Sequence, residues 1–282
     1  VFSEADRLPG LIVDQYGDTL VLQTLTQGMD RAQPLLVDLL QELVRPAGIW
    51  ERNDAPVRTR EQLAFRSGPV AGAPEPSVTV RMNGLEFHAD LAAGQKTGVY
   101  LDQRENYLAA ARWAHGDALD CFTSTGGFAL HMSRACARIE AVDSGAAALA
   151  AATQNRDRNG IGNIDFVEAD VFDLLSAYRG AGRRFQTVVL DPPAFAKSRS
   201  ALEGAGRGYK EINLRALQLL DPGGILVTCS CSHHMSETML LDAVLAAARD
   251  TRRTLRLLER RVQASDHPIL PAIPETLYLK CL

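Results

Sequence analysis

The feature that most constrains the fold of this 282-residue chain is a regular alternation of apolar runs with helical patterns, starting at about residue 100. The apolar runs predict strands at 118–122, 139–142, 164–167, 187–190 and 225–228. The patterns around them predict helices at 102–114, 127–135, 146–159, 171–178, 209–220 and 237–248. Such alternation forms a parallel sheet covered on both faces, and ligands bind at the carboxyl ends of its strands.

The rest of the chain predicts smaller features around this sheet. Segments 255–262 and 277–282 have no helix between them, so we expect an antiparallel pair at one edge. Residues 67–77, rich in proline and glycine, predict a linker, and Asn83-Gly84 predicts a hairpin turn. We therefore expect a small α+β domain over 1–75, a linker and β-hairpin over 76–99, and the main α/β domain over 100–282.

Composition excludes several classes of protein. With 30 basic and 34 acidic residues the formal net charge is −4, so a nucleic-acid surface would have to be a local patch. No uninterrupted apolar stretch approaches the roughly 18 residues of a membrane span. Five cysteines without a CxxC pair do not form a disulfide framework, and no signal-peptide pattern is present. We expect a protein of the reducing cytoplasm, and the sequence leaves its oligomeric state open.

Acidic side chains follow three consecutive predicted strands. The first strand leads through Asp120 into the loop CFTSTGGF, whose glycine spacing is not the GxGxxG of NAD enzymes. Asp143 and Asp170 end the next two strands, where carboxylates can accept hydrogen bonds from ribose hydroxyls and an adenine amino group. Each aspartate could instead cap a helix, and the double glycine could be a plain tight turn. Together they favour an adenosine ligand without pyrophosphate, which is S-adenosylmethionine.

The fourth and fifth predicted strands end in groups suited to a flat heterocycle. Asp191-Pro192-Pro193-Ala194-Phe195 is rigid and offers a hydrogen-bonding carboxylate and a stacking ring, although a capped strand end would also use an aspartate. The segment 228–234, TCSCSHH, has three interpretations: a metal site, inert buried cysteines, or a nucleophilic thiol. Zinc would need further ligands at normal spacing, so we expect no metal. We favour Cys231 as a nucleophile.

These residues resemble a known family, the class I S-adenosylmethionine-dependent methyltransferases, and more closely the bacterial large-subunit rRNA cytosine-5 methyltransferases. The resemblance covers nearly the whole chain: RLPGLIVDQYGD at 7–18, ERNDAPVRTRE at 51–61, GQKTGVYLDQREN at 94–106, then TGGF, VDSG, DPPAFAKS and SCS. Family members usually begin with an RNA-binding PUA domain, which this sequence does not include, so we expect a truncated chain. Cys121 and Ser124 depart from the aromatic-rich glycine loop of the family.

The resemblance implies a Rossmann-like methyltransferase sheet that forms 5-methylcytosine. Cys231 would add to carbon 6 of cytosine, and Asp191 would hold the base. The base that removes the carbon-5 proton stays open among Asp191, Cys229, His233 and water. The residues expected to bind the cofactor are Gln103, Arg104, Asp120, Phe122, Thr125, Gly126, Gly127, Phe128, Asp143, Ser144, Asp170, Val171 and Asp191.

We expect ribosomal RNA as the partner. Phe195 would stack on an extruded base, beside Pro192 and Pro193. Segment 197–215 predicts a flexible basic loop for phosphates, and the small domain adds a second expected basic patch; a solvated surface would look the same. The basic residues concerned are Lys197, Arg199, Arg207, Lys210 and Arg215 in the loop, and Arg52, Arg58, Arg60 and Arg66 in the small domain.

Three other functions compete with this one. A methyltransferase acting on a guanine nitrogen would use an Asp-Pro-Pro-aromatic loop without needing a thiol. An RNA chaperone that binds the cofactor without catalysis would need neither. A nicotinamide-dependent dehydrogenase is disfavoured, because the chain has no GxGxxG.

Overall fold

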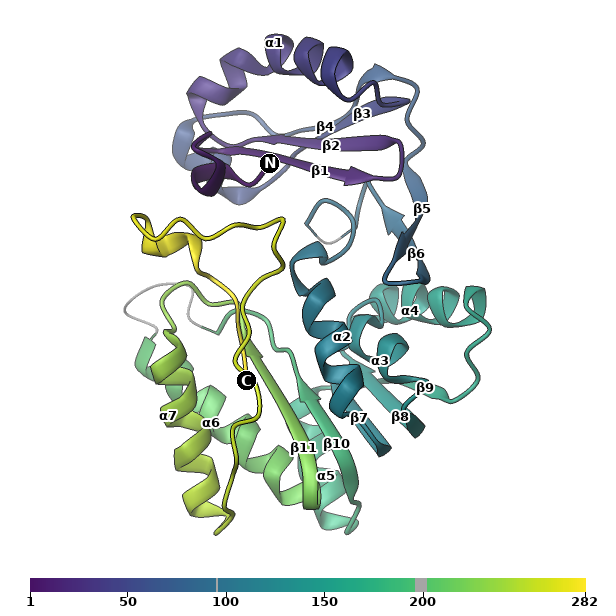
Figure 1. Ribbon diagram of the computed structural model, residues 1–282, viewed down its shortest axis with the longest axis vertical. Helices are drawn as coiled ribbons and strands as arrows, with labels where there is room; N and C mark the ends of the chain where they lie inside the picture. Colours follow the sequence, from purple (N-terminus) through teal and green to yellow (C-terminus); the bar gives the residue numbers. More distant parts are fainter. Residues whose placement is uncertain (95, 196–201) are drawn as a thin grey trace. The chain divides into compact units, whose positions relative to one another are not determined.

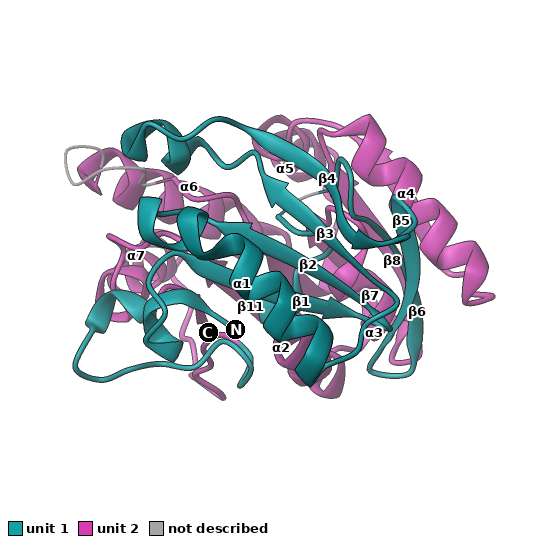
Figure 2. Cartoon of the chain, turned by 90° about the horizontal axis from the view of Figure 1, so that it is seen from above, with its two compact units in different colours: residues 1–102, 264–276 teal, residues 103–263, 277–282 magenta. Residues whose placement is uncertain are grey.

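The computed structural model describes residues 1–94, 96–195 and 202–282, and these form two compact units (Figure 2). Unit 1 comprises residues 1–102 and 264–276, and unit 2 comprises residues 103–263 and 277–282. The expected regions differ from these units in two places, because the hairpin placed at 76–99 is part of unit 1 and residues 264–276 return to that unit.

Unit 1 contains a four-stranded sheet in the order β1-β2-β3-β4 and a separate hairpin. Strands β2 and β3 are parallel, with helix α1 between them in sequence, and the other pairs of this sheet are antiparallel. Apolar residues of β1, β2 and β3 form the core beneath α1. The elements are η1 Ser3–Asp6, β1 Leu11–Tyr16, β2 Thr19–Thr24, α1 Gln27–Leu43, β3 Gly48–Asn53, η2 Pro56–Glu61, β4 Arg66–Gly72, β5 Ser77–Met82, β6 Leu85–Asp90 and η5 Pro274–Thr276.

The linker predicted at 67–77 is wrong over most of its length, because Arg66–Gly72 forms β4. This strand lies at the edge of the sheet and pairs only with β3 among the strands of the described chain. Pro69 lies opposite Trp50 in that pair. A proline is tolerated in an edge strand, since its missing N–H leaves no gap in an inner ladder.

The prediction of a basic surface patch in unit 1 is also wrong for two of its four arginines. Arg58 is fully buried, where its guanidinium donates to the Asp30 carboxylate at 2.9 Å and to the Ala64 carbonyl oxygen. Arg52 is buried and donates to the Leu91 carbonyl oxygen at 2.9 Å. Both side chains hold loops of unit 1 together and are not available to a phosphate.

Arg66 is partly exposed, with a 2.7 Å ion pair to Asp30 and a contact to Glu51, and Arg60 is exposed. The acids that pair with Arg66 lie 15 and 36 residues before it in the sequence, and the acid that pairs with Arg58 lies 28 residues before it. Arg58 and Arg66 therefore belong to a network of ion pairs that the local sequence does not indicate.

Unit 2 contains the predicted doubly wound sheet, in the order β12-β11-β10-β7-β8-β9 (Figure 1). All neighbouring strands are parallel except β12, which is antiparallel to β11. The predicted α/β fold with an antiparallel edge is thus confirmed. The short η3 Leu101–Gln103 contains the boundary between the two units in the sequence. The other elements are α2 Arg104–Trp113, β7 Gly116–Cys121, α3 Gly127–Met132, β8 Cys136–Asp143, α4 Ala146–Arg158, β9 Ile164–Glu168, α5 Val171–Gly180, β10 Phe185–Leu190, α6 Leu202–Leu219, β11 Leu220–Ser230, α7 Glu237–Asp250 and β12 Lys280–Cys281.

Two details of unit 2 differ from the expected ones. Segment 255–262 is not a strand, and contributes only a single bridge between Arg261 and Cys281. Helix α6 begins at Leu202, before the predicted start at 209, because Ala205 and Tyr209 are buried against α7 (Figure 1). That packing outweighs the low helix propensity of the glycines in its first turns. No helix of the described residues is long and apolar enough to cross a membrane.

We expect Arg58→Ala to lower the free energy of unfolding by about 3–5 kcal/mol, because it leaves the buried Thr24 carbonyl oxygen without its donor and removes one of the two arginines that pair with Asp30. Arg60→Ala, two residues away and exposed, should change it by less than about 0.5 kcal/mol. Urea denaturation of both variants measures the difference. Equal losses would show that the buried network does not stabilise unit 1.

Candidate active site

The loop between β7 and α3 is shaped by one buried carboxylate. Asp120 Oδ2 accepts hydrogen bonds from the Thr123 hydroxyl at 2.6 Å and from the Ala129 backbone N–H at 3.0 Å. The backbone between these contacts is left-handed at Phe122, Ser124 and Gly126. The loop is therefore held in one conformation at the carboxyl end of β7, although glycine occupies only one of these three strained positions.

Gly127 is required by packing inside the protein. A Cβ atom at this position would lie 2.4 Å from Cζ of the Tyr107 ring on α2. Phe128 is buried beside it, with its ring edge-on to Tyr107 at 4.8 Å. These two residues, predicted to bind the cofactor, thus fix how α3 packs on α2, and only their backbone is available to a ligand.

Carboxylates follow the three strands β8, β9 and β10. Asp143 is half-buried and accepts from the backbone N–H groups of Ser124 and Gly145, both at 2.9 Å. Asp170 caps α5 by accepting from the Asp173 N–H at 3.1 Å, as the capping alternative predicted. Val171, next to it, has its side chain in the hydrophobic core, which leaves only its backbone for a ligand.

The donor set of S-adenosylmethionine fits these residues. Its ribose hydroxyls, adenine amino group and methionine amino group donate hydrogen bonds, and its sulfonium is cationic. Asp120 Oδ1 is a buried acceptor without a hydrogen-bond partner among the described residues. With Asp143, Asp170 and Asp191 also following strands, the site offers acceptors and negative charge, which suit this ligand and repel a pyrophosphate. Beside them, Thr125 is partly exposed and Ser144 is exposed.

Asp191 follows β10 and is held by Gln103, whose Nε2 donates to Asp191 Oδ2 at 3.0 Å. Gln103 is buried, whereas Arg104 is partly exposed and lies 3.9 Å from the Glu105 carboxylate. This hydrogen bond joins Gln103, a residue of the LDQR motif carried over by resemblance, to Asp191.

Two cysteines at the end of β11 have different surroundings. Cys229 is fully buried, and a hydrogen bond with Cys281 together with burial raises the pKa of the Cys229 thiol well above its ordinary value. Cys231 is half-buried, one residue beyond the strand. Cys229 therefore stays a neutral thiol, and Cys231 is the thiol at this strand end that a reagent can reach.

Tyr209 on α6 fixes the conformation around Cys231. The Ser230 hydroxyl donates to Tyr209 Oη at 2.8 Å, and the Ser232 hydroxyl lies 3.2 Å from the same oxygen. Cys231 lies between these two serines, and its interaction with Tyr209 is one of the causes that raise the pKa of the tyrosine hydroxyl, after burial. Cys229, two residues earlier, interacts electrostatically with Asp191.

A buried lysine lies beside this segment. Lys280 Nζ donates to the carbonyl oxygens of Ser232 at 2.7 Å and Tyr278 at 2.9 Å. Burial lowers the pKa of Lys280 to about 8, and the electrostatic interaction with Cys231 acts in the opposite direction. Neither Tyr209 nor Lys280 was predicted as a site residue. The available signal for Lys280 was a single cation in an otherwise apolar predicted strand.

The predicted substrate residues are only partly free to meet a base. Pro192 is buried and Pro193 exposed, while the ring of Phe195 packs 4.8 Å from that of Tyr209. A Cβ on Gly208 would lie 3.3 Å from the Phe195 ring. Phe195 is thus half-covered by α6, which leaves part of its ring for stacking.

The basic loop expected at 197–215 is a helix from Leu202 onward, so this expectation is wrong for the described part. Its cations are paired with acids: Arg207 with Glu203 at 2.6 Å and Arg215 with Glu211 at 2.7 Å along α6, and Lys210 with Asp250 of α7 at 2.7 Å. Lys197 and Arg199 lie outside the described residues. His233 and His234 are exposed.

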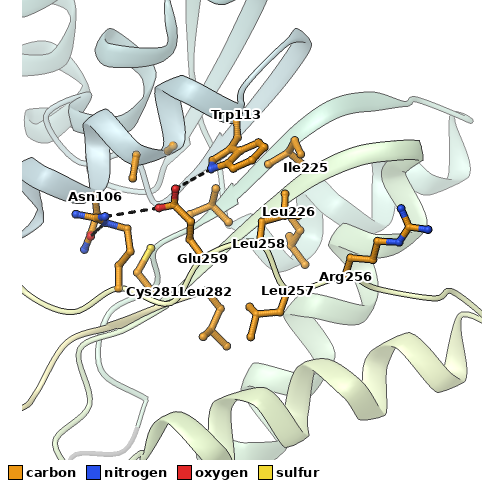
Figure 3. Close-up of a pocket in the computed structure, with 14 residues that line it drawn as sticks. Asn106, Trp113, Ile225, Leu226, Arg256, Leu257, Leu258, Glu259, Cys281 and Leu282 are labelled. Atoms are coloured by element: carbon orange, nitrogen blue, oxygen red, sulfur yellow. Dashed lines mark hydrogen bonds and ion pairs between the residues drawn. The ribbon is translucent and has the colours of Figure 1, made fainter.

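Unit 2 also contains an apolar groove (Figure 3). Its volume is about 100 Å³, and it lies between α2, β11 and segment 256–261. Trp113, Leu257 and Leu258 line it and are each about half exposed. None of the predicted site residues is among the described residues that line this groove.

Asp120 should make stability depend on pH. Burial raises the pKa of its carboxyl from 3.8 to about 7. The folded state therefore binds this proton more tightly than the unfolded state, so the contribution of Asp120 to stability is greatest in acid and is lost as the pH rises from about 4 to about 7.

We expect wild type to lose on the order of 4 kcal/mol relative to Asp120→Asn between pH 4 and pH 8. The amide oxygen of the variant still accepts from Thr123 and Ala129, and it carries no charge. Urea denaturation of both proteins across this range measures the difference, and parallel curves would contradict the assignment.

Solved structures share the fold of the chain at low sequence identity. SMU.776, a proposed methyltransferase in complex with SAH, superposes with a TM-score of 0.86 at 18% identity, over 100% of this chain and 73% of that one. The tRNA m1G37 methyltransferase of M. jannaschii superposes with a TM-score of 0.65 at 17% identity, over 98% of this chain and 76% of that one. These similarities show a methyltransferase fold.

Curated relatives are much closer in sequence. The ribosomal RNA large subunit methyltransferase I of Shewanella denitrificans is 44% identical over 287 residues, covering 100% of this chain and 72% of its own length. The protein of the same name from Cronobacter sakazakii is 41% identical, covering 99% and 72%. The S-adenosylmethionine-dependent methyltransferase family matches residues 57–281. The chain therefore belongs to the S-adenosylmethionine-dependent methyltransferase family, in the group that contains the ribosomal RNA large subunit methyltransferase I proteins.

Proposed function

We propose that this protein methylates carbon 5 of a cytosine in large-subunit ribosomal RNA, with Cys231 as a covalent nucleophile. The observation that carries the proposal is the parallel pairing of β10 with β11, in which Leu190 lies opposite Thr228. Asp191 and Cys231 follow these two strands and so lie at the same edge of the sheet. The names of the relatives support large-subunit ribosomal RNA as the substrate.

The reaction requires a thiolate because carbon 5 of cytosine is a poor nucleophile. Addition of the Cys231 thiolate to carbon 6 forms a carbon–sulfur bond and moves electron density to carbon 5. Carbon 5 would then take up the electrophilic methyl group that S-adenosylmethionine supplies when bound, with S-adenosylhomocysteine as the leaving group. Loss of the carbon-5 proton then restores the double bond as the thiolate leaves. Asp191 would hold the base and the charge that develops on it.

The surroundings of Cys231 support its role as the thiolate. The ammonium of Lys280 is bound to the carbonyl oxygen of the following residue, Ser232, and a nearby cation favours the ionised form of a thiol. Cys229 is a poor candidate for the nucleophile or for the proton-removing base, since its thiol is buried and shares a hydrogen bond with Cys281. This leaves Asp191, His233 or water as the base.

We place S-adenosylmethionine at the carboxyl ends of the strands, the same edge of the sheet that bears Asp191 and Cys231. Asp143 would accept from the ribose hydroxyls and Asp170 from the adenine amino group, while the β7–α3 loop would face the methionine part. The location in the reducing cytoplasm, predicted from the cysteines, belongs to this proposal too; all five cysteines are free thiols.

Cys231→Ala should abolish methyl transfer to cytosine, with a loss of about 10³-fold or more, because no other group can activate carbon 5. Transfer of labelled methyl to large-subunit ribosomal RNA from cells lacking the protein measures this. RNA with fluorine at carbon 5 should trap wild type as a covalent adduct on a denaturing gel, since fluorine cannot leave as a proton.

Cys229→Ala is the matched control and should still form the adduct. The competing function, methylation of a guanine nitrogen, needs no thiol. Retention of most of the turnover in Cys231→Ala, with label on guanine, would establish that alternative.

Lys280→Met should slow the alkylation of Cys231 by iodoacetamide at pH 7 roughly three- to tenfold, because the cation that favours the thiolate is gone. Lys280→Arg keeps the charge and should react nearly as fast as wild type. Mass spectrometry after a short exposure identifies Cys231 as the site, since the other four cysteines are buried. Equal rates in the two variants would remove Lys280 from the mechanism.

A further inference from the structure

Asp191 lies at the end of a continuous chain of hydrogen bonds through unit 2. Arg261 Nε donates to Asn106 Oδ1 at 3.0 Å, and Asn106 Nδ2 donates to Gln103 Oε1 at 2.7 Å. Gln103 Nε2 then donates to Asp191 Oδ2 at 3.0 Å. Gln103 and Asn106 are 3% and 1% exposed, so water cannot replace their partners easily. We call this set the Arg261–Asp191 relay.

The direction of every hydrogen bond in the relay is fixed from its outer end. A guanidinium can only donate, so the oxygen of the Asn106 amide must face Arg261. The amide nitrogen of Asn106 consequently faces Gln103, and it also donates to the Val262 carbonyl oxygen at 3.1 Å. Because the oxygen of the Gln103 amide accepts from Asn106, the nitrogen of this amide must face Asp191. The relay therefore places an N–H donor against the Asp191 carboxylate.

Arg261 itself is held by acids at the surface. Its guanidinium lies 3.6 Å from the Glu259 carboxylate and 3.7 Å from that of Glu105. Glu259 also accepts from the indole N–H of Trp113 at 3.1 Å (Figure 3). Asn106 and Arg261 line the apolar groove, so the relay runs from that groove to the strand end that bears Asp191.

From this geometry we infer that Asn106 and Arg261 are positioning residues, which hold Asp191 as a hydrogen-bond acceptor of fixed orientation by setting the orientation of the Gln103 amide. The inference depends on the proposed function in one respect only, which is that Asp191 binds the target base. Among the described residues, the Cys229 thiol also interacts electrostatically with Asp191, and Gln103 contacts this thiol as well.

Asn106→Asp tests the relay, because it changes one NH₂ group to oxygen at nearly constant size. The new carboxylate still accepts from Arg261 but cannot donate to Gln103. The Gln103 amide should turn over to donate to residue 106, which places its oxygen against Asp191. A carboxylate that loses a donor and faces an acceptor binds its proton more tightly.

The measurement is the titration of the Asp191 carboxyl carbon by NMR in protein labelled with ¹³C-aspartate, with Asp191→Asn to assign the signal. We expect the midpoint to rise by about one pH unit or more in Asn106→Asp. Asn213→Asp, another buried asparagine of unit 2 whose amide donates to the Tyr209 carbonyl oxygen, is the matched control and should leave the midpoint unchanged.

Arg261 supplies a second test at a partly exposed site, where folding is not at risk. Arg261→Met should shift the midpoint in the same direction, and Arg261→Lys, which keeps a donor, should restore it. A midpoint that moves by less than about 0.3 pH units in both Asn106→Asp and Arg261→Met would overturn the inference. Because this readout does not involve methyl transfer, it separates failure of the relay from failure of the proposed cytosine chemistry.

Discussion

The candidate site depends on the parallel pairing of β10 with β11. The carboxyl ends of two neighbouring parallel strands lie at the same edge of the sheet, so the residues that follow them lie there too. At that edge a carboxylate, Asp191, and a half-buried thiol, Cys231, follow adjacent strands. The surrounding contacts refine this placement: Tyr209 fixes the serines on either side of the thiol, and Gln103 holds the carboxylate.

The sheet of unit 2 could be predicted from sequence because its strands are buried on both faces and therefore read as short, continuous apolar runs. The start of α6 could not, since its glycines argue against a helix and the reason for the helix is contact of Ala205 and Tyr209 with α7. Strand β4 was not predicted because its proline and glycines are typical of a linker. An edge strand tolerates these residues, since it pairs on one side only.

The positions of Asp191 and Cys231 at neighbouring strand ends could be predicted, because each lies in a contiguous motif that follows a predicted strand. The role of a side chain was not predictable where it acts through a partner distant in sequence. Arg58 reads as a surface cation because Asp30 is 28 residues away, and Asn106 reads as one more polar residue of a helix because Arg261 lies 155 residues further on. Only the fold shows which buried donor meets which acceptor.

The close approach of Gly127 to Tyr107 affects how the glycine-rich loop should be studied. A methyl group at this position would act as a wedge between α2 and α3, and its first effect would be to spread the two helices. Loss of cofactor affinity in such a variant would then report on helix spacing and would not identify a ligand contact. Gly127 lies in a loop of the kind that binds ligands, but in this protein its lack of a side chain allows α2 and α3 to pack closely.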